Sequence, residues 1–521
     1  MPRRHIPLAM AVAGGLLMAL SFPLGPPLPI PNIQGFWPAA WFCLAPVILA
    51  ALRARNEWGA ARYGLVSGMT AFGLLICWID PFLVRWANLS HVEAAAVFLL
   101  LVTYVAIYFG AFAVCVRAWS RRWGSATACL LAPVGWCALE WTRGILFTGF
   151  PWCLLGYSQM PALAVVQVAD LAGVYGVSFV LAASGALVAI LVERPGSSRR
   201  ASLAVLTGIL VTASGYGAWR LAYPPRKGAG EIKAALVQTS VAQSDKWDPD
   251  ERLRIEADHF EMTRRAAGRG AGLVVWSESA VPASITHDPA YARRLEDLAR
   301  ETGADLLLGT VSYESRDGAN VPFNSAVIVG PAGGVTGRYD KIHLVPFGEY
   351  VPLKGYLFFL EPLVQEASDF HPGEGVTLLQ GGGAPLGALI CYEAIFPALV
   401  RRFTLAGAQV LVNITNDAWY EDTAMPRQHL MQAAMRAVEN RRPLLRCANT
   451  GISAIVEPTG RIVSASRLGE KTILEGSVRP ADQNTLYAGT GDVFAILCVI
   501  LTASSMAAAL IPRSPGGHHA G

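Results

Sequence analysis

Eight long apolar stretches limit what this chain can fold into more than any other feature of its sequence. They are Ile6–Phe22, Phe36–Leu52, Ala61–Ile79, Val92–Val116, Ser125–Leu139, Leu163–Val192, Leu203–Tyr223 and Val493–Ile511. A helix of about 20 apolar residues crosses a bilayer. The mean hydropathy of +0.39 and the 15% of charged residues also fit a membrane protein, since soluble proteins have about 25%. We therefore predict a polytopic α-helical membrane bundle of eight spans.

The first stretch has a second interpretation. Arg3 and Arg4 precede its short apolar core, which also fits a cleaved signal peptide. Because six further spans follow it before residue 224, an uncleaved first helix is the simpler interpretation.

Arginine is concentrated on one side of such a bundle if the spans alternate. Twelve arginines fall on that side, and they are Arg3, Arg4, Arg53, Arg55, Arg62, Arg117, Arg121, Arg122, Arg194, Arg199, Arg200 and Arg513. Only Arg85 and Arg143 fall on the other side. Positively charged loops stay in the cytoplasm. We therefore expect both termini to be cytoplasmic and residues 224–491 to lie outside, in the periplasm if the membrane is a bacterial inner membrane.

We divide the chain into three parts: a membrane domain of residues 1–223, residues 224–491, and the eighth span with its tail, residues 492–521. The composition of residues 224–491 is that of a soluble α/β domain. Expected strands are Ile232–Val241, Leu273–Ser277, Asp305–Val311, Ser325–Val329, Leu386–Cys391, Val410–Ile414, Leu444–Ala448 and Ile452–Val456. Expected helices are Asp250–Ala267, Ala290–Thr302, Ala394–Ala406 and Arg427–Asn440. This alternation indicates a layered domain whose reactive residues lie on loops at strand ends.

Three segments place a reactive side chain after an apolar strand: Leu273–Pro282 with Glu278, Gly337–Pro352 with Lys341 and Glu349, and Leu386–Pro397 with Cys391. A thiol between a strand and a helix lies near free N–H groups and a positive dipole end, which predicts a lowered pKa and a nucleophile. The alternatives are ordinary ones, because a lone cysteine is often a core residue and a Glu or Lys at a strand end is usually a surface group. Cys447, inside a strand, is expected to be inert.

Other classes of site find no support in the sequence. Of the nine cysteines, seven lie in or beside apolar stretches, and none forms a CxxC or Cys/His cluster with metal-ligand spacing. The net charge of +4 follows the arginine loops and forms no basic patch. We predict no metal, no cofactor and no nucleic-acid partner.

The three segments, in chain order, resemble the Glu–Lys–Cys signature of the carbon–nitrogen hydrolase (nitrilase) superfamily. The apolar stretches on both sides and the sequence of Tyr339–Pro352 narrow the resemblance to the apolipoprotein N-acyltransferases of bacterial inner membranes. Lys246–Pro249, Asn413–Tyr420 and the segment from Arg442 to Ser453 are also similar to that family. The resemblance covers essentially the whole chain and implies an α-β-β-α sandwich of nitrilase type for the soluble domain.

The resemblance also implies roles. Cys391 would take an acyl chain from a phospholipid as a thioester, Glu278 would act as the base, and Lys341 would stabilise the oxyanion. The acyl group would pass to the α-amino group of the N-terminal diacylglyceryl-cysteine of an apolipoprotein. Glu349 is expected to hold Lys341, while Tyr392 and Glu393 shape the pocket. The partners implied are the phospholipid donor, the diacylated acceptor and the membrane, and the enzyme is expected to be a monomer.

An apolar path must connect the bilayer to the thiol, because moving an acyl chain into water costs about 0.8 kcal/mol per CH₂. We expect Tyr356–Leu360 and the loop Phe147–Tyr157 to form its walls. The residues assigned to substrate access are Trp247, Tyr356, Phe358, Phe359 and Trp419. A buried core helix over Tyr356–Leu360 is the alternative.

Two rival functions remain open at this level. A membrane-tethered amidase or nitrilase would use the same residues and transfer the acyl group to water. A transporter with an appended domain would need charges inside the spans, for which Glu140, Asp170 and Asp80 are the candidates.

Overall fold

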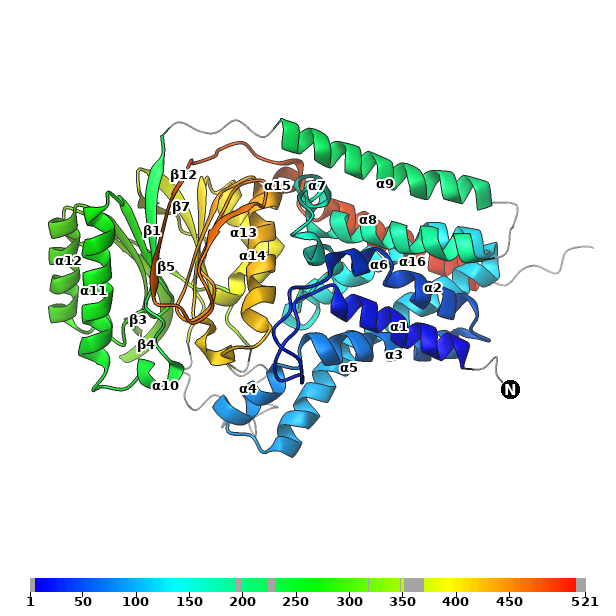
Figure 1. Ribbon diagram of the computed structural model, residues 1–521, viewed down its shortest axis with the longest axis horizontal. Coiled ribbons are helices and arrows are strands. Elements are labelled where there is room, and N and C mark those ends of the chain that lie inside the picture. Colours follow the sequence, from blue (N-terminus) through cyan, green and yellow to red (C-terminus); the bar gives the residue numbers. More distant parts are fainter. Residues whose placement is uncertain are drawn as a thin grey trace, which may run out of the picture.

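The computed structural model in Figure 1 describes residues 5–193, 199–223, 230–316, 318–346, 348–350 and 370–511. A helical bundle and an α/β domain lie end to end along its long axis. The N-terminus lies at the end of the bundle that is far from the α/β domain.

Two sheets form the centre of the α/β domain. The first has the order β12 (Thr472–Val478), β1 (Ile232–Gln238), β2 (Leu273–Trp276), β3 (Asp305–Arg316), β4 (Ala319–Val329), β5 (Val335–Asp340). The second has the order β11 (Ile462–Ala465), β10 (Ala454–Val456), β9 (Leu444–Ala448), β8 (Val410–Thr415), β7 (Ala384–Ile390), β6 (Leu379–Gly381). The sequence analysis missed β5, β6, β11 and β12, which are short or lie at sheet edges. In both sheets the central strands, β1–β2–β3 and β7–β8–β9, are parallel and buried.

Helices cover the outer faces of the two sheets (Figure 1). The first sheet packs against α11 (Arg252–Gly268) and α12 (Pro289–Thr302), and the second against α13 (Pro397–Leu405) and α14 (Met425–Asn440). The domain is therefore the expected four-layered α-β-β-α sandwich. Most residues of α14 are buried, because its other side packs against α8 (Ala169–Val192) and the short 3₁₀ helix η4 (Leu155–Gln159) of the bundle.

The bundle contains a helix at each predicted apolar stretch. The helices are α1 (Ile6–Leu20), η2 (Trp37–Trp41), α2 (Leu44–Leu52), α3 (Glu57–Leu75), α4 (Ile79–Trp86), α5 (His91–Trp123), α6 (Ser125–Ile145), η3 (Leu146–Thr148), α7 (Leu163–Val166), α8 (Ala169–Val192), α9 (Arg199–Ala222) and α16 (Val493–Leu510). Shorter helices in the rest of the chain are α10 (Gln243–Lys246), η6 (Cys391–Ile395), η7 (Asp417–Tyr420) and α15 (Leu486–Thr490).

The prediction of eight membrane spans is confirmed in part. Within the described residues, four helices are long and apolar enough to cross a membrane, namely α5, α8, α9 and α16, and a fifth is possible if α3 and α4, bent by 54°, count as one span. α1 and the pair η2–α2 are shorter apolar helices. α6 is long enough, but Glu140 and Arg143 make its second half polar.

The sixth apolar stretch is broken where the bundle meets the α/β domain. α7 ends at Val166, and Gly173 inside α8 has φ +65° and a non-helical ψ. A Cβ at Gly173 would lie 2.8 Å from the ring of Tyr487, so a side chain is excluded there by both space and backbone conformation. The break lets Tyr487 of α15 pack onto the start of α8.

Candidate active site

The site lies where strands of the two sheets end. Glu278 follows β2, Lys341 follows β5 and Cys391 follows β7. β5 runs in the same direction as β2, because β5 is antiparallel to β4, β4 is antiparallel to β3, and β3 is parallel to β2. The carboxyl ends of β2 and β5 therefore lie at one edge of the first sheet. Both the Glu278 carboxylate and the Lys341 ammonium act electrostatically on the Cys391 thiol, so the structure brings the three together.

Cys391 begins a tight turn rather than an α-helix. Its φ of +53° lies in the left-handed region, which a non-glycine residue adopts only where its surroundings enforce it. The turn is the 3₁₀ helix η6, and α13 starts only at Pro397. The expectation of a helix from Ala394 to Ala406 is thus wrong at its start.

The predicted lowering of the Cys391 pKa is also wrong. Burial raises the pKa of the thiol, and the Glu278 carboxylate raises it further, while Lys341 opposes the shift. No α-helix N-terminus follows the thiol directly, so the dipole that the sequence suggested does not act there. At neutral pH the resting group is a thiol, and it needs a proton acceptor before it can attack.

Glu278 is placed to be that acceptor. It is buried, its Oε1 accepts a hydrogen bond of 2.8 Å from the Asn324 side chain, and its Oε2 accepts one of 2.9 Å from the backbone N–H of Asn416. The Lys341 Nζ lies 3.5 Å from Oε1. These contacts fix the carboxylate from three sides.

Lys341 is held by two carboxylates. Its Nζ donates to Glu349 Oε1 at 2.9 Å, and Asn324 Nδ2 donates to the same oxygen at 2.8 Å. Burial alone would lower the pKa of Lys341, but Glu349 and Glu278 outweigh it and hold the pKa above its usual range. Lys341 is therefore a permanent cation beside the thiol.

Glu393 connects η6, the turn that begins at Cys391 and is called the cysteine turn below, to the segment that follows Lys341. Its Oε1 accepts hydrogen bonds from the Tyr339 hydroxyl at 2.6 Å and from the backbone N–H groups of Ile342 and His343 at 2.8 and 3.1 Å. Its Oε2 accepts one from the N–H of Ile390 at 2.8 Å. Burial raises the pKa of Glu393, and these donors oppose the shift. The side chain therefore fixes the position of Cys391 relative to Lys341.

Tyr392 lies on the side of the turn that faces the bundle. Its half-buried ring meets the ring of Phe396 edge-on, with centroids 5.0 Å apart. Tyr350 and Tyr104 of α5 are close enough to interact with it electrostatically. The ring of His343 lies tilted against that of Phe396, with centroids 3.8 Å apart, and burial next to Lys341 lowers the pKa of His343 to about 4.

Sequence reasoning missed three polar side chains of the site. Lys246 is fully buried and donates from Nζ to the backbone oxygen of Glu278 at 2.9 Å, and burial lowers its pKa to about 8. Asn324 joins Glu278 to Glu349, as described above. His429 contacts the backbone oxygen of Cys391. Of these, only Lys246 lay in a segment that the sequence analysis had singled out.

A buried polar network binds the carbonyl oxygen of Cys391 and so supports the cysteine turn. The Cys391 carbonyl oxygen accepts from His429 Nε2 at 3.2 Å and from Asn413 Nδ2 at 3.4 Å. Arg446 Nη2 donates to Asp417 Oδ2 at 2.8 Å and lies 3.1 Å from His429 Nδ1. Burial would raise the pKa of Asp417, but Arg446 and His429 lower it to about 2. This network holds the left-handed backbone of Cys391 in place.

Of the five residues predicted to form the access path, the structure describes Trp247 and Trp419. Tyr356, Phe358 and Phe359 lie outside the described residues. Trp247 follows α10 and is 52% exposed. Trp419 lies in η7 and packs edge-on against Trp86 of α4, with ring centroids 5.3 Å apart.

The loop Phe147–Tyr157, expected to form a wall of the access path, divides into two parts. Phe147 is exposed and lies near Tyr104 of α5, whereas Trp152 and Tyr157 are buried beneath the cysteine turn. The Trp152 ring lies 5.9 Å from that of His429, and the Tyr157 hydroxyl donates to the backbone oxygen of Ile395 at 3.4 Å. The second half of the loop therefore supports the site.

Glu140 and Asp170, two of the charged residues considered for a transport pathway, both bind protein groups, and only Asp170 reaches the α/β domain. Glu140 accepts from the backbone N–H of Leu155 at 2.7 Å, and Asp170 binds Arg441, which follows α14, at 2.6 Å. No group of three potential metal ligands is found in the described ranges. The fold and the site define a class: a thiol acyl-transfer enzyme of the nitrilase type, carried on apolar helices.

The family comparisons place the chain more narrowly. The Carbon-nitrogen hydrolase family matches residues 233–485, and the Apolipoprotein N-acyltransferase N-terminal domain matches residues 14–187. The chain is 38% identical to an apolipoprotein N-acyltransferase of Geobacter metallireducens, over 99% of this chain and 97% of that protein. It is 35% identical to one of Methylococcus capsulatus, over 94% of each. The chain belongs to the apolipoprotein N-acyltransferase family.

Solved structures resemble the α/β domain. An amidase from Nesterenkonia sp. is 24% identical with a TM-score of 0.37, covering 51% of this chain and 94% of its own. A nitrilase-superfamily protein from Saccharomyces cerevisiae is 21% identical with a TM-score of 0.39, covering 52% and 96%.

Proposed function

We propose that this protein N-acylates the α-amino group of the N-terminal diacylglyceryl-cysteine of apolipoproteins, with a phospholipid as the acyl donor and Cys391 as the carrier. The observation that carries the proposal is the Cys391 thiol, which shares one strand-end site with the base Glu278 and the cation Lys341. Family membership agrees with this substrate pair.

In the first half-reaction, the Cys391 sulfur attacks the ester carbonyl of the phospholipid while Glu278 takes the thiol proton. The negative charge that develops on the carbonyl oxygen is stabilised by the Lys341 ammonium, assisted by a backbone N–H of the cysteine turn. The C–O bond then breaks, and Glu278 returns the proton to the departing lysophospholipid. A thioester at Cys391 remains.

In the second half-reaction, the free amine of the diacylated cysteine attacks the thioester. Glu278 takes a proton from the amine, Lys341 again faces the oxyanion, and the C–S bond breaks to give an amide. The sulfur regains its proton from Glu278. Both half-reactions use one site, so the two lipid substrates take turns in it.

The proposal includes the orientation. The excess of arginine in one set of loops supports cytoplasmic termini and a periplasmic catalytic domain in a bacterial inner membrane. The helices counted above support insertion in the membrane, and the eight-span topology remains part of the proposal. We propose that one chain is sufficient for activity, since Glu278, Lys341 and Cys391 all come from the same chain.

Access from the bilayer is proposed for the side of the turn that carries Tyr392. This ring is close enough to Tyr104 of α5 to interact with it electrostatically, and the exposed Phe147 lies near Tyr104. Trp419 packs against Trp86 of α4. An acyl chain that enters here would stay among aromatic side chains on its way to Cys391.

The test is a two-stage assay with an alkyne-labelled phospholipid and a diacylated lipopeptide. The full-length enzyme in mixed micelles should first gain one acyl chain by intact mass and then pass it to the peptide amine. Release of free fatty acid at the same rate with and without the peptide would instead favour transfer to water, as in an amidase. A chain that never becomes acylated would contradict the proposal.

A further inference from the structure

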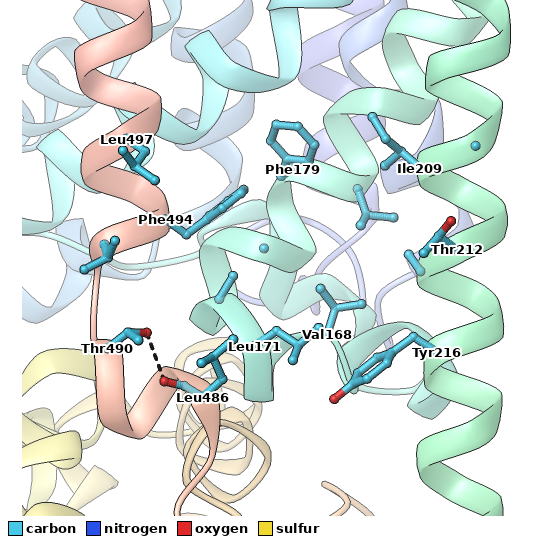
Figure 2. Close-up of a pocket in the computed structure, with 16 residues that line it drawn as sticks. Val168, Leu171, Phe179, Ile209, Thr212, Tyr216, Leu486, Thr490, Phe494 and Leu497 are labelled. Atoms are coloured by element: carbon cyan, nitrogen blue, oxygen red, sulfur yellow. Dashed lines mark hydrogen bonds between the residues drawn. The ribbon is translucent and has the colours of Figure 1, made fainter.

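A groove between α8, α9 and α16 plays no part in the reaction described above. Its volume is about 740 Å³, and apolar side chains line nearly all of it (Figure 2). The walls include Leu171 and Phe179 of α8, Ile209 and Thr212 of α9, and Phe494 and Leu497 of α16. The groove is therefore a site within the apolar helices, bounded by segments that precede and follow the catalytic domain.

The groove borders α9 from Gly208 to Tyr216. The buried residues of α9 are Ser202, Leu206 and Gly217. At Gly217 the helix touches α7, since a Cβ there would lie 1.6 Å from the Ala164 oxygen. At Gly208, which lines the groove, a Cβ would meet nothing within 4 Å. α9 is thus packed against protein on both sides of the groove, at Ser202 and Leu206 before it and at Gly217 after it, and is unsupported by protein at Gly208 between them.

Something apolar must fill this space in a membrane. Helices in a bilayer associate mainly through van der Waals packing, and an unfilled gap loses those contacts on every wall. Water is excluded by the apolar lining. The abundant material of suitable chemistry is an acyl chain, which can enter from the side.

One end of the groove has a surplus of positive charge. Tyr216, which lines the groove, donates from its hydroxyl to Asp170 Oδ1 at 2.6 Å. Asp170 Oδ2 accepts from Arg220 Nε at 2.9 Å and from Arg441 Nη2 at 2.6 Å. Two guanidinium groups therefore share one carboxylate, which leaves one positive charge.

Arg220 is the member of this cluster that an occupant can reach. It lies one turn after Tyr216 on the same helix face, and its side chain is 19% exposed, against 2% for Arg441. Among the described residues, only its Nε has a hydrogen-bond partner. The two remaining guanidinium nitrogens match the geometry with which arginine binds phosphate.

We propose that the groove holds one glycerophospholipid of the surrounding bilayer, with an acyl chain between α8 and α9 and its phosphate on Arg220. This lipid fills the gap that the protein leaves and joins α9 to α8 and α16. It is not a substrate, because the groove and the cysteine turn lie on different elements.

Native mass spectrometry of the full chain in a mild detergent tests the proposal. The wild type should retain one phospholipid per chain, and Cys391→Ala should retain it equally, which separates this lipid from an acyl-enzyme. Gly208→Phe places a ring in the groove and should lower the retained fraction by about tenfold. Gly215→Phe is the matched control, because Gly215 also faces open space on α9 but does not line the groove.

Further variants guard against a folding defect. Thr212→Phe should act like Gly208→Phe, and Arg220→Gln should release the lipid at lower collision energy than the wild type. A wild-type chain without bound lipid would overturn the proposal, as would a folded Gly208→Phe chain that retains it fully. A dimer that Gly208→Phe converts to a monomer would show that a second copy of this chain fills the groove.

Discussion

The Nε2–H of His429 donates a hydrogen bond of 3.2 Å to the backbone oxygen of Cys391. A carbonyl oxygen can only accept, so Nε2 carries the proton. Burial and Arg446 lower the pKa of His429, and Asp417, whose Oδ1 lies 3.3 Å from Nδ1, opposes the shift. The imidazole thus supports the strained nucleophile through its main chain, without contact with the reacting atoms.

This relationship predicts the behaviour of His429→Ala. Losing the donor frees the Cys391 carbonyl, so kcat for acylation should fall by about tenfold or more while KM for phospholipid stays nearly constant. His429→Gln, which can still donate to that oxygen, should recover part of the rate. An equal loss in both variants, with an unchanged melting temperature, would contradict the positioning role.

Acylation is expected at Cys391 alone. Intact mass after incubation with phospholipid should show one added acyl chain in the wild type and none in Cys391→Ala. Cys447→Ala is the control, because the Cys447 thiol is buried within β9 and donates to backbone oxygens of Val237 and Val275. An adduct that survives in Cys391→Ala would refute the assignment.

The charged pair should matter for turnover more than for binding. Glu278→Gln and Lys341→Met should each lower kcat by a factor of about a hundred or more, because both act as charge develops in the transition state. Glu349→Gln should retain more activity, since its amide oxygen can still accept from Lys341. If Lys341→Met instead loses phospholipid binding as much as turnover, Lys341 is a structural cation.

The raised pKa of Cys391 predicts slow alkylation at neutral pH. A small neutral reagent such as iodoacetamide should modify it more slowly than a free cysteine near pH 7, since the thiolate is the reactive form. The rate should rise as the pH increases, with no plateau below about pH 9. Mass spectrometry after timed quenching measures this, and fast modification at neutral pH would show a preformed thiolate.

Asp417 makes stability depend on acid pH. Its pKa is held at about 2 in the fold against 3.8 for the ordinary group, so the stabilisation is complete above about pH 4 and is lost as the pH falls toward 2. Asp417→Asn leaves the guanidinium of Arg446 buried without its charge partner. The melting temperature of this variant should be well below that of the wild type at pH 7, and the gap should narrow below about pH 4. A gap that is constant with pH would contradict the pairing.

The sequence predicts the positions of Glu278, Lys341 and Cys391 at strand ends well, because a buried strand that stops at a polar residue leaves a local pattern. It fails where distant segments decide the outcome. The start of η6 could not be foreseen, since His429, Asn413 and Glu393 together hold the left-handed backbone at Cys391. The direction of the thiol pKa likewise follows from burial and from Glu278, which is remote in sequence.

In the bundle, too, contacts between residues far apart in the sequence could not be predicted. Hydropathy identifies each apolar helix, but the interruption of the sixth stretch depends on the contact of Gly173 with Tyr487, far along the chain. The bend between α3 and α4 comes where Asp80 and Pro81 start a new helix. The burial of Lys246 could not be predicted, because its partner, the backbone oxygen of Glu278, carries no sequence signal.

The position of α16 has a consequence for biogenesis. This helix packs against α5 and α6, which are made early, yet the whole catalytic domain separates it from them in the chain. During synthesis, the faces of α5 and α6 that α16 will cover stay uncovered until the catalytic domain has emerged from the ribosome. Insertion of α16 is therefore the last step in assembling the bundle. A nascent chain arrested before α16 would leave these faces of α5 and α6 exposed to membrane quality control.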